Sequence, residues 1–300
     1  MVAVAFLYLC FTGIMFLGSL ILTTNHYPLF VAGVRFLVSG LILLTFYLSQ
    51  HKNFQYAQLT QLITPLFFKY SLCLYTLSTI GFSWGLQYVD PVKACFVFVL
   101  APFVTAIFLY FLKGEQLSTQ KIIGLIIGFI SVIPIILESS HGEFSHVPWH
   151  LSMIGYLVFA SAVIFFAYGW TLSTELYQSI HNIPSLLITA IAFMLGGSIS
   201  LIILLIIHPQ EAFNIELTSE FGWLLLLYSI LSAISYNLYT VLLRQYSPTF
   251  ISFASFLEPA FGLLYAFLFL GQSLSIIAFC SLIGLGLGLY IFYQEELRSQ

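Results

Sequence analysis

The sequence predicts an all-α integral membrane protein with ten transmembrane helices, arranged as two inverted five-helix repeats. Three observations predict this fold class: the composition, the recurrence of long apolar runs, and a stretch that occurs twice. Of the 300 residues, 60% are hydrophobic and 6% are charged, whereas charged residues make up about 25% of a soluble domain. The chain therefore lacks the polar residues that would cover the surface of a soluble protein of this size.

The repeated stretch is Asp90–Ser118, which recurs without a gap 157 positions later as Ser247–Ser275. Each copy has a proline at its second position, a further proline at Pro102 or Pro259, and the ending Gly-Glu/Gln-x-Leu-Ser. Because proline and glycine both constrain the backbone, their matched positions indicate an internal duplication.

Five spans are expected in the first half, and each ends where polar or helix-breaking residues interrupt an apolar run. Asn25–Pro28 forms a turn, Ser49–Gln61 a polar loop, Asp90-Pro91 a short break and Lys113–Gln120 a further loop. With about 20 residues needed for each crossing, the spans cover about 2–23, 29–48, 64–88, 92–112 and 121–137.

The second half is expected to contain the other five spans. Ser173–Asn182, His208–Glu211 and Arg244 separate the sixth to ninth spans, and a very short connection at Gly271 precedes the tenth. These spans cover about 149–171, 184–207, 219–243, 248–270 and 275–293, and the last two repeat the fourth and fifth. The expected domains are a first repeat at 1–138, an external linker at 139–148, a second repeat at 149–293 and a cytoplasmic tail at 294–300.

The positions of lysine and arginine predict the orientation, because cytoplasmic loops carry most of these residues. With both termini in the cytoplasm, the outer loops contain only Lys93, while the inner loops and tail contain Lys52, Lys113, Lys121, Arg244 and Arg298. Both termini are therefore expected on the cytoplasmic side of the inner membrane. Each repeat has an odd number of spans, so the second enters the membrane from the opposite side. Such inverted repeats are typical of secondary carriers, whose binding site lies near the midplane between the halves.

This arrangement resembles the drug/metabolite transporter superfamily, specifically its EamA type, over nearly the whole chain. The resemblance rests on Pro-x10-Pro-x11-Gly-Glu-x-Leu-Ser in the first half and on Leu257-Glu258-Pro259 with Gly271-Gln272-x-Leu-Ser in the second. Arg35, shortly after a turn proline, also fits the members' pattern. Gln272 departs from it, since members usually have glutamate there, so proton coupling through that position is not expected. The resemblance implies a transporter of small metabolites; members carry amino acids and their derivatives, S-adenosylmethionine, nucleotide sugars, toxic cations or riboflavin.

Glu258 is the first candidate for a binding residue, because a charge in the membrane core costs about 2.5–3.5 kcal/mol even on a mild insertion scale. It lies ten residues into the ninth span, roughly 15 Å deep at a rise of ~1.5 Å per residue. Two interpretations fit. Either the carboxylate binds a cationic group, a proton, or each in turn; or it is structural, paired with Arg35 or protonated and hydrogen-bonded to a neighbouring helix.

Arg35 is the second candidate, in the second span and about 10 Å below the outer surface. Its guanidinium fits a bidentate contact with a substrate carboxylate or phosphate, but also a side chain that extends to the interface or pairs with Glu258. One deep anion and one cation favour a zwitterion, namely an amino acid or amino-acid derivative. The family's range adds a specific candidate, S-adenosylmethionine exchanged against its demethylated product, S-adenosylhomocysteine.

Two groups of aromatic and polar residues are candidates for lining the site. Trp84 and Tyr88, one turn apart near the end of the third span, fit either a vestibule or an aromatic belt at the interface. Tyr236, Asn237 and Tyr239 form a cluster in the eighth span that is costly against lipid, so an interior position is expected.

Four further residues are expected to shape helices or interfaces. Pro102 and Pro259 occupy matched positions and are expected hinges, because proline removes a backbone hydrogen bond and bends a helix. Tyr168 and Trp170 are expected at the membrane interface.

Other function classes fit the sequence less well. The seven histidines lie in loops or at span ends, and neither an HExxH motif nor a CxxC pair indicates a metal centre, so no enzyme, metal or cofactor is expected. A net charge of -3 offers no basic surface for nucleic acid. The expected partners are a small-molecule substrate, a counter-substrate or proton, and the lipid bilayer; a homodimer is left open. The alternatives are an exporter of cationic drugs or other metabolites, and a non-carrier channel or flippase.

Overall fold

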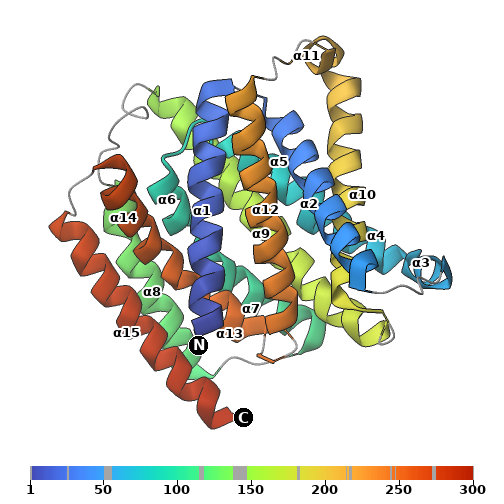
Figure 1. The fold of residues 1–300 in the computed structure, drawn as a ribbon. Helices are drawn as coiled ribbons and strands as arrows, with labels where there is room; N and C mark the ends of the chain where they lie inside the picture. Colours follow the sequence, from blue (N-terminus) through green and yellow to red (C-terminus); the bar gives the residue numbers. More distant parts are fainter. Residues whose placement is uncertain are drawn as a thin grey trace.

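Every element that the computed structural model describes is helical, and the helices pack into one bundle (Figure 1). The structure describes residues 2–25, 27–50, 56–114, 118–137, 147–180, 183–213, 215, 218–243, 245–246, 248–271 and 275–299. The predicted all-α fold class is confirmed. Most of the expected linker at 139–148 lies outside the described residues, as do Lys52, Arg244 and Gln272.

The helices follow one another in the same order in both halves. The first half consists of α1 (Val2–Asn25), α2 (Pro28–Gln50), α3 (Tyr56–Leu62), α4 (Pro65–Ser71), the π-helix η1 (Leu72–Leu77), α5 (Ser78–Gly85), α6 (Pro91–Phe98), α7 (Leu100–Lys113) and α8 (Thr119–Leu137). The second half consists of α9 (Trp149–Ser179), α10 (Ser185–Ile207), α11 (Pro209–Phe213), α12 (Ser219–Leu242), α13 (Pro248–Phe253), the 3₁₀-helix η3 (Ala254–Phe256), α14 (Leu257–Leu270) and α15 (Ile276–Ser299).

Within the described residues, seven helical segments are long and apolar enough to cross a membrane, judged by length and composition. They are Val2–Thr24, Pro28–Gln50, Pro91–Leu112, Trp149–Ser179, Ser185–Ile207, Ser219–Leu242 and Phe250–Phe269. Two shorter apolar stretches lie in α8 and α15, and the expected third span changes geometry along its length from α4 through η1 to α5. The chain is thus an all-α membrane protein, and the count of ten spans stays a prediction.

Two helices continue beyond their expected ends. α9 runs to Ser179 through the polar stretch, because Ser173 and Thr174 donate hydrogen bonds to the carbonyls of Trp170 and Thr171, at 2.6 and 2.8 Å, one turn earlier. Polar side chains that bond their own helix do not end it. α15 runs to Ser299, so the stretch expected as a polar tail is helical.

The bounds of α2 and α7 match those of α10 and α14 at a displacement of 157 residues. α2 and α10 each have 23 residues, and α7 and α14 each have 14. Both α7 and α14 end in a glycine with positive φ, Gly114 at 66° and Gly271 at 63°, which is a conformation that glycine adopts without strain. In Figure 1, α6 lies above α7 whereas α13 lies below α14, so these copies run in opposite directions. The beginning of α1 and the end of α15 lie at the same end of the bundle.

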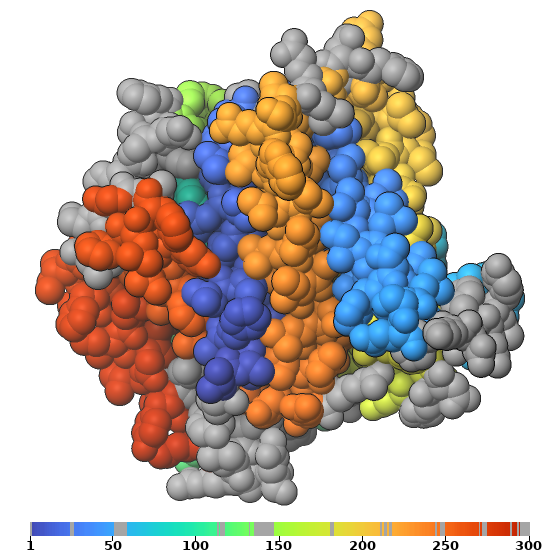
Figure 2. Space-filling model, viewed as in Figure 1, coloured from blue at the N-terminus to red at the C-terminus, as the bar shows by residue number. Residues whose placement is uncertain are grey.

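Helices of one half pack on the equivalent helices of the other half. α2 packs on α10, and α8 packs on α15. The first helix of each half contacts the other half in the same way: α1 packs on α12 and α14, and α9 packs on α5 and α7. Figure 2 shows α1 and α12 side by side on one face of the molecule. The interface between the halves therefore lies at the centre of the bundle.

The π-helix η1 is enclosed by glycines of two other helices. A Cβ at Gly169 of α9 would lie 2.6 Å from the Cβ of Leu74, and one at Gly196 of α10 would lie 2.6 Å from the Cβ of Tyr75. Both distances are shorter than packed carbon atoms tolerate. A π-turn is wider than an α-turn, and these glycines give it room.

Candidate functional site

The helix that carries Glu258 is interrupted one turn before its proline, and its counterpart in the first half is interrupted at the same place. Val99, between α6 and α7, has φ −58° and ψ −13°, and Phe256, before α14, has φ −59° and ψ −13°. Each break precedes Pro102 or Pro259 by three residues. Proline cannot donate to the carbonyl four residues earlier, and its ring crowds that carbonyl, which explains why the break precedes the proline.

Glu258, two residues after its break, is a fully buried carboxylate. Neither of its carboxylate oxygens has a hydrogen-bond partner among the described residues. The titratable groups that interact with it electrostatically are Tyr8, Cys95, Tyr236 and Tyr239. Because an ion removed from water costs several kcal/mol unless it is paired, a bound cation or proton would stabilise this side chain.

Arg35 is another buried charged group, and residues of the other half accept its hydrogen bonds. Its Nε donates to the hydroxyl of Ser232 at 2.7 Å and its Nη1 to the hydroxyl of Tyr228 at 2.8 Å, while its Nη2 is buried without a hydrogen-bond partner. Its guanidinium carbon lies 4.3 Å from the ring centroid of Tyr228 and 4.7 Å from that of Phe36. In the described part of the chain no hydrogen bond joins Arg35 to Glu258. The geometry therefore does not favour the interpretation that each charge exists to neutralise the other.

A cluster of aromatic rings connects the two charges. The guanidinium carbon of Arg35 lies 5.9 Å from the ring centroid of Tyr236, and Glu258 interacts electrostatically with the same tyrosine. Trp170 stacks on Tyr239 with ring centroids 3.7 Å apart. Phe11, Phe36 and Phe193 contact Tyr236 edge-on at centroid distances of 5.2, 5.5 and 5.5 Å. These six rings are named the Tyr236 cluster below, and such rings suit both a cation and a flat ligand ring.

Comparison with known proteins identifies the family. Residues 1–137 and 153–294 match the EamA-like transporter family. This chain is an EamA-family transporter. The EamA-family assignment also means that the chain is similar to transporters rather than to enzymes.

Two relatives of this EamA-family transporter carry the same description, "S-adenosylmethionine/S-adenosylhomocysteine transporter". The one from Chlamydia muridarum is 30% identical over 275 residues, which cover 91% of this chain and 85% of the relative. The one from Chlamydia trachomatis serovar L2 is 28% identical over 275 residues, which cover 91% and 82%. A solved crystal structure of a protein 14% identical in sequence superposes with a TM-score of 0.71 over 97% of both chains, and this likeness shows a shared fold.

The structure brings some of the predicted site residues together and separates others. Glu258, Arg35, Tyr236 and Tyr239 lie within one interior region, as described above. Asn237 lines an apolar hollow of about 470 Å³ among α1, α2, α10 and α12, and its Oδ1 lacks a hydrogen-bond partner among the described residues. Since neighbouring residues of a helix point in different directions, Asn237 faces away from the Tyr236 cluster. A binding role for Asn237 stays a prediction.

Trp84 and Tyr88 lie near the start of α2 and the end of α10, outside the Tyr236 cluster. Their ring centroids are 4.9 Å apart, and Trp84 lines a hollow of about 400 Å³ that also includes Pro28 and His208. This location fits both interpretations that the sequence leaves open, a vestibule and an interface belt. Their role in binding stays a prediction.

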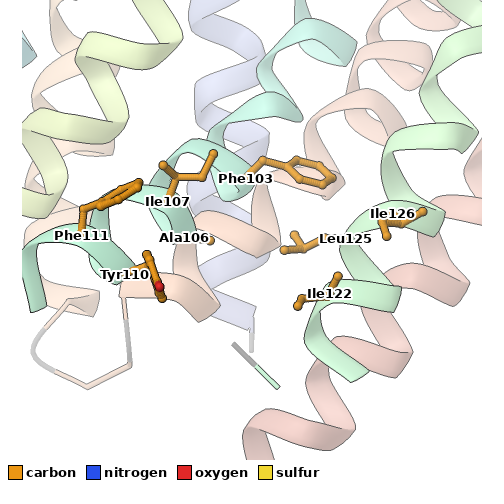
Figure 3. A pocket seen from close by; sticks show the side chains of 8 residues that line it. All are labelled: Phe103, Ala106, Ile107, Tyr110, Phe111, Ile122, Leu125 and Ile126. Carbon is orange, nitrogen blue, oxygen red and sulfur yellow. The ribbon is translucent and has the colours of Figure 1, made fainter. Parts of the chain in front are cut away.

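A separate hollow lies between α7 and α8, and neither Arg35 nor Glu258 is among the residues that line it (Figure 3). It has a volume of about 560 Å³, and its lining is apolar except for the hydroxyl of Tyr110. Ile107 and Phe111 in its wall are 54% and 76% exposed. In a bilayer such a surface contacts lipid tails, so it offers a polar substrate nothing to bind.

The sequence predicts Trp170 at the membrane interface, but the structure places it in the interior. It is 2% exposed and stacks on Tyr239. The prediction was wrong because α9 extends to Ser179, well beyond the expected end of the span. Tyr168 is half-buried, with its ring centroid 5.0 Å from that of Phe108.

Proposed function

We propose that this EamA-family transporter carries a zwitterionic amino-acid derivative across the inner (cytoplasmic) membrane by alternating access, and that it exchanges S-adenosylmethionine for S-adenosylhomocysteine. The observation that carries the proposal is Glu258, a carboxylate buried between the halves with both oxygens unbonded among the described residues. The chlamydial relatives, whose description names this pair, supply the substrate.

The chemistry of S-adenosylmethionine matches the groups of the site. It has a carboxylate, an ammonium, a sulfonium and a flat adenine. We assign the carboxylate to the free Nη2 of Arg35 and a cationic group to Glu258. The rings of the Tyr236 cluster contact the sulfonium and the adenine through cation–π and stacking interactions. S-adenosylhomocysteine lacks the sulfonium charge and keeps the other groups, so the same site accepts it.

A proton is the second cation that Glu258 can take up. Among the described residues, the titratable groups that interact with it electrostatically include the tyrosines Tyr8, Tyr236 and Tyr239 and the thiol of Cys95. These groups carry no positive charge, so they cannot neutralise a carboxylate. A proton replaces the substrate cation when the site is empty, which makes a proton or the second nucleoside the counter-substrate.

Alternating access follows from the repeated backbone. Inverted repeats move relative to one another around a site near the midplane, and the breaks at Val99 and Phe256 give the two halves equivalent points of bending. We place both termini in the cytoplasm, in accordance with the positions of lysine and arginine.

The test is uptake of radiolabelled S-adenosylmethionine into proteoliposomes that contain the purified protein. Preloading with unlabelled S-adenosylmethionine or S-adenosylhomocysteine should accelerate uptake, because only an alternating site shows counterflow. Uptake without acceleration would indicate a channel or flippase. Uptake of a lipophilic cation in place of S-adenosylmethionine would indicate a drug exporter and contradict the proposal.

A further inference from the structure

The surroundings of Arg35 show how the site selects its ligand's anionic group. We infer that Tyr228 and Ser232 are positioning residues that fix the guanidinium of Arg35 and leave Nη2 as the one nitrogen that meets the substrate carboxylate. The inference rests on the proposed function, since it concerns the carboxylate of the same substrate.

Hydrogen bonds use two of the three guanidinium nitrogens. Nε bonds the hydroxyl of Ser232 and Nη1 bonds the hydroxyl of Tyr228. The Ser232 hydroxyl in turn donates to the backbone carbonyl of Tyr228 at 2.6 Å. Its proton is therefore committed, and its lone pairs point to Arg35. A guanidinium bonded at two nitrogens and lying beside two aromatic rings cannot rotate freely.

The backbone around Arg35 is fixed to the same helix of the other half. The hydroxyl of Ser39, one turn further along α2, lies 2.7 Å from the carbonyl oxygen of Arg35 and 2.7 Å from that of Ser229 in α12. All of these groups are buried. The distance between α2 and α12 is therefore set at the level of the guanidinium.

A glycine in a third helix makes room for the Tyr228 hydroxyl. A Cβ at Gly18 of α1 would lie 2.6 Å from this oxygen and 3.2 Å from the Cζ of the ring. Contacts that short force the side chain to move. Gly18 therefore permits the hydrogen bond between Tyr228 and Arg35, although it contributes no polar group.

The arrangement predicts selection for a carboxylate. Nη2 is buried and unbonded among the described residues, so a ligand without an acceptor at this place leaves it unsatisfied. A hydrogen bond to a charged group is worth roughly 10- to 100-fold in affinity, and a site with a buried donor rejects a ligand that cannot accept from it.

The binding experiment compares S-adenosylmethionine with its decarboxylated analogue on four proteins: the parent, Tyr228→Phe, Gly18→Ala and Gly222→Ala. Tyr228→Phe removes the hydrogen bond, Gly18→Ala displaces the hydroxyl, and Gly222→Ala is the matched control, because its Cβ meets nothing within 4 Å. The first two variants should weaken binding of S-adenosylmethionine about 10-fold and change the affinity for the analogue by no more than about twofold. Equal losses for both ligands would show that Tyr228 is merely structural and would overturn the inference.

A measurement without ligand separates this inference from the proposed function. The chain has three arginines, so guanidinium ¹⁵N resonances can be assigned to Arg35 with an Arg35→Lys variant. The parent should show separate Nη1 and Nη2 signals, and Tyr228→Phe should merge them as rotation becomes free. A merged signal in the parent overturns the positioning role, whatever the substrate. Separate signals in a protein that binds neither nucleoside would refute the substrate and leave the anchoring of Arg35 intact.

Discussion

The two halves of the molecule share a backbone and differ in the chemistry they bring to the interface between them. At the displacement of 157 residues that relates their helices, Arg35 corresponds to Ala192 and Glu258 corresponds to Ala101. Both alanines are buried, at 0% and 2% exposure. Each half therefore contributes one charge, and the equivalent place in the other half holds a small apolar residue.

Each charge also interacts with side chains of the opposite half. Arg35 of α2 is hydrogen-bonded to Tyr228 and Ser232 of α12, and Glu258 of α14 interacts electrostatically with Tyr8 of α1. A symmetric backbone allows two equivalent conformations that open to opposite sides. Under the proposed function, the asymmetric side chains would give a bound zwitterion one orientation in both. The backbone that the halves share would thus serve movement, and the side chains that differ between them would serve recognition.

The largest expected effect is all-or-none and tests the inversion itself. Thr119 and Ile276 are equivalent positions at the starts of α8 and α15. In a variant whose four native cysteines are replaced, Ile276→Cys should react with a membrane-impermeant thiol reagent in intact cells. Thr119→Cys should react only after permeabilisation, because the inverted copy begins on the other side. Labelling of both from one side would show that the two halves are not inverted.

The next largest effect concerns the charge of the second half. Glu258→Gln keeps the shape of the side chain but cannot pair with a cation, so exchange of S-adenosylmethionine should fall by about 100-fold or more. Thermal unfolding should show an unchanged or higher midpoint, since a buried charge is removed. Uptake into proteoliposomes is the measurement, and full activity of Glu258→Gln would exclude this carboxylate from the mechanism.

The charge of the first half should have a graded effect. Arg35→Ala should weaken binding of S-adenosylmethionine by roughly 10- to 100-fold, and Arg35→Lys should weaken it less, because the charge remains while the planar guanidinium is lost. Titration of ligand into the purified variants gives both affinities. If lysine proved as harmful as alanine, charge would not be what the site requires at this position.

The smallest expected effects come from the shared backbone, and they should be equal in the two halves. Pro102→Ala and Pro259→Ala should each slow exchange by about 3- to 10-fold while changing affinity less than twofold, because each removes a point of bending and no ligand contact. Exchange rates and dissociation constants are measured side by side. Unequal effects of the two prolines would show that the halves do not move equivalently.

The fold and the charges of the site could be predicted because each has a strong local pattern. The composition and the matched prolines predict a duplicated membrane protein, and Arg35 and Glu258 are conspicuous within apolar runs. The breaks at Val99 and Phe256 follow from Pro102 and Pro259, although they lie three residues earlier than the prolines themselves.

The aromatic and polar surroundings of the charges could not be predicted, because tertiary packing alone distinguishes them. Trp170 is 2% exposed, whereas Trp149 and Trp223 are 77% and 67% exposed, and all three lie in helices. In a chain with 18% aromatic residues, no local pattern separates a ring that packs on the site from one that faces lipid. Tyr228 and Ser232 were missed for the same reason.

The π-helix η1 marks a local difference in length between the two halves. After it, buried residues of the first half match those of α12 at a displacement of 157, as with Phe82 and Tyr239 at 5% and 3% exposure. Before η1, the buried residues match those of α12 at a displacement of 158. Tyr70 and Tyr228, for example, are 0% and 1% exposed. Between Tyr70 and Phe82 the first half therefore holds one residue more than the matching part of α12, and the wide π-turn contains it.

An insertion absorbed in this way should be removable. Deleting one residue within Leu72–Leu77 should convert η1 into ordinary α-helix and leave α4 and α5 on their present neighbours. The same deletion at the matching level of α12 would rotate everything beyond it by about 100° and separate Tyr228 from Arg35. Survival of the first deletion and loss of the second, measured as monodisperse folded protein, would identify η1 as the turn that accommodates this extra residue.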